Sequence, residues 1–105
     1  MNENKANYEY TNLEKFSKEI QRNIMGEIES NENISKDLNI NSKLVASISG
    51  VKELEEKSED MWKFTRTVTY SLPQSQCFIV KCTKFFETEA QMKEYKHSYV
   101  EYHSG

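Results

Sequence analysis

The fold is decided by the stretch 61-MWKFTRTVTYSL-72, followed by 73-PQSQ-76 and 77-CFIVKCTKFF-86. In its first part, large apolar residues alternate with mostly polar ones, which is the pattern of a strand that buries one face. The apolar face carries Trp62, Phe64, Val68, Tyr70 and Leu72. Pro73 suits the second position of a turn, and the last part is again β-branched and aromatic. The stretch therefore predicts a β-hairpin.

Amphipathic helices are predicted on both sides of this hairpin. Thr11 and Glu14 form a capping-box pattern, and the apolar stripe around them predicts a helix from about Asn12 to Glu29. That stripe consists of Leu13, Phe16, Ile20, Ile24 and Ile28. Thr88 and Gln91 form a second capping box, which opens the last helix. One face of this last helix carries Met92, Tyr95, Tyr99 and Tyr102.

A third strand is predicted ahead of the hairpin. From Lys43 onward the chain is rich in small and β-branched residues, so we expect a strand to about Glu55, with a bulge or close packing at Gly50. The order α-β-β-β-α indicates an α+β fold: a three-stranded antiparallel meander flanked by N- and C-terminal helices that cover one face. Residues 1–10 are expected to form a loose arm or a short added strand. We interpret residues 1–105 as a single small domain.

Length, composition and the apolar runs indicate the size of the core and the cellular location. With 105 residues, of which 36% are apolar and 30% charged, we expect room for one core. The longest apolar run, residues 77–80, falls far below the roughly 20 residues that cross a bilayer. The N-terminus lacks an apolar signal core, so a cytoplasmic location is predicted. Cys77 and Cys82 point to opposite faces of one predicted strand and are expected to stay reduced.

Residues 34–50 support a second interpretation. The spacing of Ser35, Leu38, Asn39, Ile40, Val45 and Ile48 resembles the helix-turn-helix family over about 20 residues. The resemblance implies a winged helix-turn-helix DNA-binding regulator in which the hairpin is the wing. The turn position holds Asn39 instead of Gly, and Lys43 is the one base between Ser42 and Gly50, where a DNA-reading helix normally brings several. From the sequence, both helix-turn-helix and loop plus strand remain open.

The element order also resembles that of double-stranded-RNA-binding domains. In that family the last helix opens with a basic cluster, whereas the corresponding residues here are Glu87, Thr88, Glu89 and Ala90. The resemblance therefore implies the topology without RNA binding. The net charge is −5 over residues 1–60 and +2 over residues 61–105, so the acidic half also argues against direct nucleic-acid binding.

Side chains for catalysis or metal binding are few. His97 and His103 are six residues apart, so on a helix they face directions about 120° apart. Glu94 and Glu101 flank His97 at helical spacing, which exposed ion pairs explain more simply than a metal site, since a closed site needs more ligands. The three glycines form no phosphate-binding loop. We expect no enzyme activity, no metal and no cofactor.

The leading hypothesis is a non-catalytic binding protein that acts by protein–protein contact. Small size and abundant Asn, Lys, Glu and Ile favour a bacterial or phage accessory factor of the inhibitor or immunity type. We expect the acidic segment 52–60 to engage a basic protein surface, as on a nucleic-acid-processing enzyme. Arg66 and the last helix offer further contact residues. The candidate partner-binding residues are Glu53, Glu55, Glu56, Glu59, Asp60, Arg66, Tyr95, Tyr99 and Tyr102. No membrane partner is expected, and the oligomeric state is left open.

Overall fold

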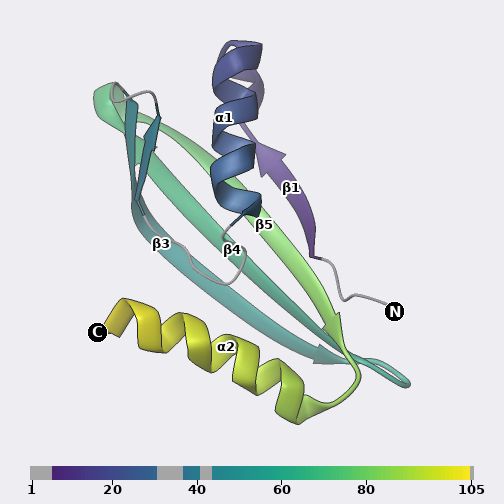
Figure 1. Ribbon diagram of the computed structural model, residues 1–105. Helices are drawn as coiled ribbons and strands as arrows, with labels where there is room; N and C mark the ends of the chain where they lie inside the picture. Colours follow the sequence, from purple (N-terminus) through teal and green to yellow (C-terminus); the bar gives the residue numbers. More distant parts are fainter. Residues whose placement is uncertain (1–5, 31–36, 41–43, 105) are drawn as a thin grey trace.

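The computed structural model describes residues 6–30, 37–40 and 44–104, the backbone alone for residues 39–40, 44–45 and 98–104 (Figure 1). The fold is α+β, with two α-helices packed on an antiparallel sheet. The elements are β1 (Asn7–Thr11), η1 (Leu13–Lys15), α1 (Lys18–Glu29), β2 (Leu38–Ile40), β3 (Leu44–Lys57), β4 (Trp62–Leu72), η2 (Pro73–Ser75), β5 (Gln76–Phe86) and α2 (Glu89–Ser104).

The predicted hairpin forms the centre of the sheet. β4 and β5 pair antiparallel along their whole length, with Val68 opposite Val80. Pro73 opens the connecting turn, as predicted. β3 pairs antiparallel with β4, so the predicted meander is present. Its register shifts between Ile48 and Gly50, which confirms the bulge, one of the two possibilities predicted at Gly50, and leaves Ser49 as the extra residue.

The prediction of three strands is wrong, because the sheet also contains β1 and β2. β1 pairs with β5 on one side, making four strands, and the three-residue β2 pairs with the start of β3, which gives the order β1-β5-β4-β3-β2. Both added strands are short and depend on a long neighbour for their hydrogen bonds. Tyr10 also fixes β1 to α1, because its hydroxyl donates to Glu29 Oε2 at 2.6 Å.

The helix-turn-helix hypothesis fails on the backbone. Its DNA-reading helix would span residues 42–50, and the described part of that range, 44–50, lies in β3. Leu38 to Ile40, which would contain the turn, form β2. Ser35 lies outside the described residues. Alternating β-branched and small side chains therefore form a strand here, as the other interpretation predicted.

The first helix begins later than predicted. Asn12 adopts a left-handed conformation with φ of 70°, which ends β1 and prevents a helix from starting at Thr11. The N-cap of α1 is Ser17, whose Oγ accepts a hydrogen bond from the Ile20 amide at 3.3 Å. The predicted end at Glu29 is confirmed.

The capping box of the last helix is confirmed. The Gln91 amide donates to Thr88 Oγ1 at 3.2 Å, and the Thr88 amide donates to Gln91 Oε1 at 3.3 Å. The two residues thus satisfy each other's backbone donors at the start of α2.

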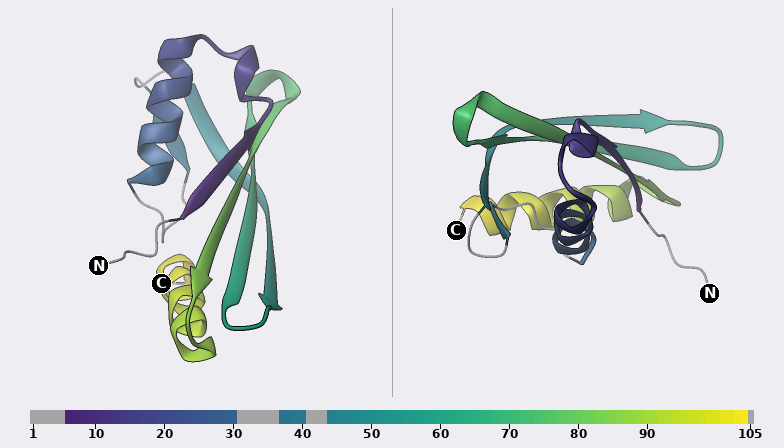
Figure 2. Two further views of the ribbon diagram at one scale, coloured as in Figure 1. Left: turned by 90° about the vertical axis from the view of Figure 1, so that its right-hand side faces the viewer. Right: turned by 90° about the horizontal axis from the view of Figure 1, so that it is seen from above.

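Both helices lie on the same face of the sheet, α1 over one half and α2 over the other, while none of the described elements covers the opposite face (Figure 2). The core is accordingly divided in two, where one core was predicted. The buried members of the α1 cluster are Leu13, Ile24, Leu38, Ala46, Val68, Tyr70, Leu72, Phe78 and Val80. Those of the α2 cluster are Phe64, Phe86 and Met92, with Trp62 and Tyr95 packed against them.

Candidate interaction surface

Arg66 separates the two apolar clusters and is a buried structural residue. It follows Phe64 and precedes Val68 on the helix-covered face of β4, and its side chain is only 3% exposed. Arg66 Nε donates to Glu53 Oε2 across the β3–β4 pair at 3.1 Å. Its guanidinium carbon lies 5.1 Å from the centre of the Phe64 ring and 5.5 Å from that of Tyr95. Arg66 is therefore inaccessible to a partner in this conformation.

Glu55 is likewise committed to contacts within the molecule. Lys96 Nζ of α2 donates to Glu55 Oε2 at 2.8 Å and lies 3.8 Å from Glu53 Oε1, while Lys93 Nζ lies 3.7 Å from Glu55 Oε1. The hydrogen bond from Lys96 lowers the pKa of the Glu55 carboxyl, and the same bond raises the pKa of Lys96. These contacts hold α2 against β3, so Glu53 and Glu55 contribute to the fold.

The remaining predicted acidic residues lie elsewhere. Glu56 lies on the open face of the sheet, with its Oε1 3.8 Å from Lys63 Nζ. Glu59 and Asp60 form the exposed turn between β3 and β4. Glu87, which was not among the candidates, follows β5 at the same end, since Phe86 pairs with Trp62. Within the described part of the chain, Glu59, Asp60 and Glu87 make no ion pair. We call these three carboxylates the acidic end.

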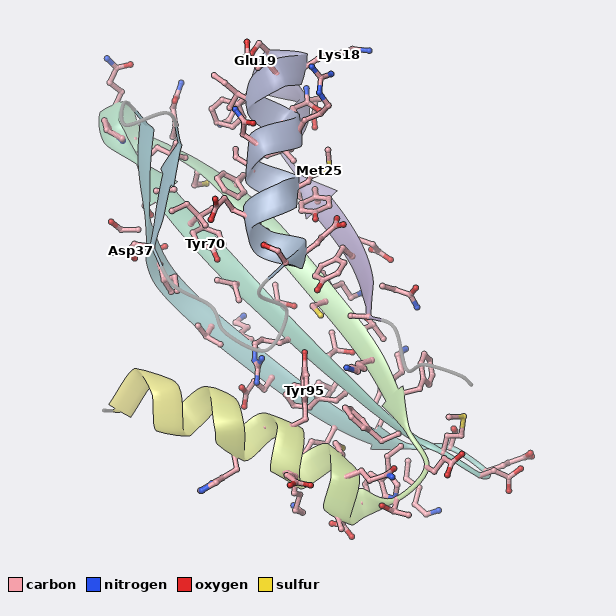
Figure 3. All side chains as sticks on the ribbon, in the orientation of Figure 1. Lys18, Glu19, Met25, Asp37, Tyr70 and Tyr95 are labelled. Carbon is pink, nitrogen blue, oxygen red and sulfur yellow. The ribbon has the colours of Figure 1, made fainter. Side chains whose placement is uncertain are left out.

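Tyr95 is the one predicted contact tyrosine of α2 whose side chain is described, and it packs against the α2 cluster. Tyr95 packs edge-to-face on Phe64 with ring centres 5.8 Å apart and tilted on Phe86 at 5.3 Å. Figure 3 shows Tyr95 directed from α2 toward the sheet. Lys84 Nζ lies 4.8 Å from the centre of its ring. The side chains of Tyr99 and Tyr102 lie outside the described part of the structure. Tyr95 therefore serves mainly to dock α2.

The open face of the sheet is rich in hydroxyl groups. Across β3, β4, β5 and β1 it carries Ser47, Lys52, Leu54, Glu56, Lys63, Thr65, Thr67, Thr69, Ser71, Cys77, Ile79, Lys81, Thr83, Phe85, Asn7, Glu9 and Thr11. Two large apolar side chains stand out: Leu54 is 54% exposed and Phe85 is 37% exposed. Leu54 lies between Lys52 and Glu56 on this face, and Phe85 lies opposite Lys63 of β4. Phe85 lies two residues before Glu87, next to the acidic end.

The histidines and cysteines of the described residues lie apart from one another. They contain no group of three or more His, Cys, Asp or Glu side chains arranged to hold a metal ion. His97 is exposed on α2. Neither Cys77 nor Cys82 forms a disulfide; they lie on the open face and the helix-covered face respectively.

None of the helices in the described ranges is both long and apolar enough to cross a membrane. Comparisons with protein-family models, with curated proteins and with solved structures found no match.

Proposed function

We propose that this chain is a non-catalytic binding protein, an accessory factor of the inhibitor or immunity type, which engages a basic protein surface. The observation that carries the proposal is the acidic end beside Phe85. Glu59, Asp60 and Glu87 are exposed carboxylates that make no ion pair among the described residues, and they lie at the same end of the sheet as the exposed ring of Phe85. An apolar anchor bordered by charge is a common arrangement at protein–protein contacts.

The negative charge of the acidic end favours a partner with a basic surface. A group of carboxylates at the tip of a hairpin attracts basic surfaces, accelerates encounter and fixes orientation. Proteins that process nucleic acids carry basic surfaces of this kind, so such an enzyme is the partner class we favour. Phe85 would then supply the short-range apolar contact once the charges have aligned the two molecules.

The test uses charge reversal at the acidic end. Glu59→Lys/Asp60→Lys changes two exposed residues of a turn, so it should leave the melting temperature nearly unchanged. The matched control is Glu14→Lys/Glu19→Lys, which changes the net charge equally on exposed residues of η1 and α1, away from the acidic end. The three immobilised proteins are used to capture proteins from a bacterial lysate, and the captured proteins are identified by mass spectrometry.

A supporting result is a basic protein that the original chain and the control variant both capture and the acidic-end variant loses. With that protein purified, biolayer interferometry at several salt concentrations should show association that slows with salt for the original chain. Phe85→Ser should raise the dissociation rate of the same complex. Equal binding by all variants, or the absence of any protein that discriminates them, would exclude the acidic end as the contact.

A further inference from the structure

The outer edge of β3 has no strand partner among the described residues over most of its length. β2 pairs only with the first residues of β3, Leu44 to Ala46. After that, the Ile48 amide donates to Asp37 Oδ1 at 3.0 Å. Within residues 6–30, 37–40 and 44–104, no strand pairs with this edge from Gly50 to Lys57. An open edge of this kind is a template for pairing with another strand.

The turn between β3 and β4 determines which main-chain groups point outward. The Ser58 amide donates to the Met61 carbonyl at 2.9 Å, so these two residues are a hydrogen-bonded pair. In an antiparallel ladder such pairs alternate with pairs that are not hydrogen-bonded. The main-chain N–H and C=O groups of Leu54 therefore point toward β4 and bond to Thr65. The residues whose N–H and C=O groups point away from β4 are Val51, Glu53, Glu55 and Lys57.

Leu54 lies at the middle of this unpaired edge, and its apolar side chain interrupts the row of charged side chains there. Sheet edges of soluble proteins usually carry charged side chains or bulges that discourage pairing. Here Leu54 is 54% exposed and is flanked on the same face by Lys52 and Glu56, charges of opposite sign at equal distances along the strand. This arrangement is complementary to itself under a twofold rotation.

We propose that two copies of this chain pair antiparallel through the β3 edge, with the twofold axis at Leu54. A twofold perpendicular to the sheet keeps the same face on the same side in both copies and places residue i opposite residue 108 − i. Leu54 then meets Leu54 of the second copy, and Lys52 meets Glu56 of the second copy twice. All three are non-hydrogen-bonded pairs, in which the side chains approach most closely.

Shifted registers are less favourable. An axis at Lys52 or at Glu56 would place like charges opposite each other, and an axis at Glu55 would place Leu54 against Glu56 of the second copy. In the proposed register, Glu53 lies opposite Glu55 of the second copy on the helix-covered face. Those carboxylates already have cationic partners, Arg66 and Lys96, in their own copy. The pairing of opposite charges therefore favours the register in which the twofold axis of the dimer passes through Leu54.

The test measures mass in solution and then swaps the charges. The full chain should sediment as a dimer of 12.4 kDa subunits, in a manner that depends on concentration. Lys52→Glu alone, or Glu56→Lys alone, turns both cross-copy attractions into repulsions, so each should raise the dimer dissociation constant by about tenfold or more. The double variant Lys52→Glu/Glu56→Lys restores the opposite charges and should restore the dimer.

Two further variants distinguish pairing through the β3 edge from contact through the acidic end. Leu54→Lys places like charges at the axis and should give a monomer with an unchanged circular dichroism spectrum, because Leu54 is exposed. Glu59→Lys/Asp60→Lys lies outside the paired segment and should leave the dimer intact, whatever its effect on a partner. A chain that is monomeric at all concentrations, or a dimer that the single reversals leave intact or that the double variant fails to restore, would overturn the inference.

Discussion

Glu53→Gln should destabilise the protein more than Arg66→Met, although Arg66 is the larger and more deeply buried side chain. Removing the Glu53 charge takes away the carboxylate that accepts from Arg66 Nε, while the guanidinium stays buried against the rings of Phe64 and Tyr95. Breaking a buried pair in this way typically costs ~3–5 kcal/mol. The Glu53 side chain is 19% exposed, so water partly offsets the loss. We therefore expect a loss of about 2–3 kcal/mol in the free energy of unfolding.

Arg66→Met removes the buried charge itself. The methionine side chain is long, flexible and apolar, so it can fill the space between the α1 cluster and the α2 cluster. Glu53 would retain Lys96, whose Nζ lies 3.8 Å from its Oε1. Exchanges of buried ionic groups for apolar ones of similar volume are often neutral or stabilising. We expect a change within about 1 kcal/mol.

Urea unfolding, followed by Trp62 fluorescence and by far-UV circular dichroism, measures both free energies. The double variant Glu53→Gln/Arg66→Met should be close to Arg66→Met alone, because most of the cost of Glu53→Gln comes from the buried guanidinium and only the partly exposed contact with Lys96 is lost in addition. If Glu53→Gln costs no more than Arg66→Met, the buried charge is not what makes the pair important, and packing alone accounts for this region.

Phe64→Ala should lower the free energy of unfolding by ~3–5 kcal/mol in urea titrations, because Phe64 is 1% exposed in the α2 cluster. The Lys96 bond lowers the pKa of Glu55 below its ordinary 4.5, so its stabilising contribution is present above that value and is lost as the pH falls. Glu55→Gln should accordingly lower the melting temperature at neutral pH and much less in acid. Ser17→Ala should cost ~1 kcal/mol by removing the cap of α1, while Thr11→Ala should cost less by the same measurement.

Local patterns predicted the long elements correctly. The alternation in β4 and β5, the bulge at Gly50 and the capping box at Thr88 each depend on a few neighbouring residues, so they can be recognised from sequence. The start of α1 was predicted wrongly because Thr11 and Ser17 both fit a helix N-terminus. The pairing of β1 with β5 keeps Thr11 in a strand and leaves Ser17 as the N-cap. That pairing joins residues about 70 apart in the chain.

The alternation of side chains along a strand could also have predicted how the acidic segment 52–60 divides between the two faces of β3. Two-residue periodicity places Glu53 and Glu55 on one face of a strand and Glu56 on the other, so the segment could have been divided from sequence once β3 was extended to Lys57. The cationic partners of Glu53 and Glu55 were not predictable in the same way. Arg66 reaches Glu53 through the register of the β3–β4 turn, and Lys96 reaches Glu55 from a helix 41 residues away.

The division of the core has a consequence for hydrogen exchange. α2 is held by a small apolar cluster and by ion pairs of Lys93 and Lys96 that water can reach, whereas α1 covers the larger cluster. Partial unfolding would therefore release α2 while β4 and β5 stay paired under α1. Amides of α2 should exchange in a separate, less protected unit than those of the central hairpin, and high salt should widen the difference. We therefore expect two cooperative units built on one continuous pair of strands.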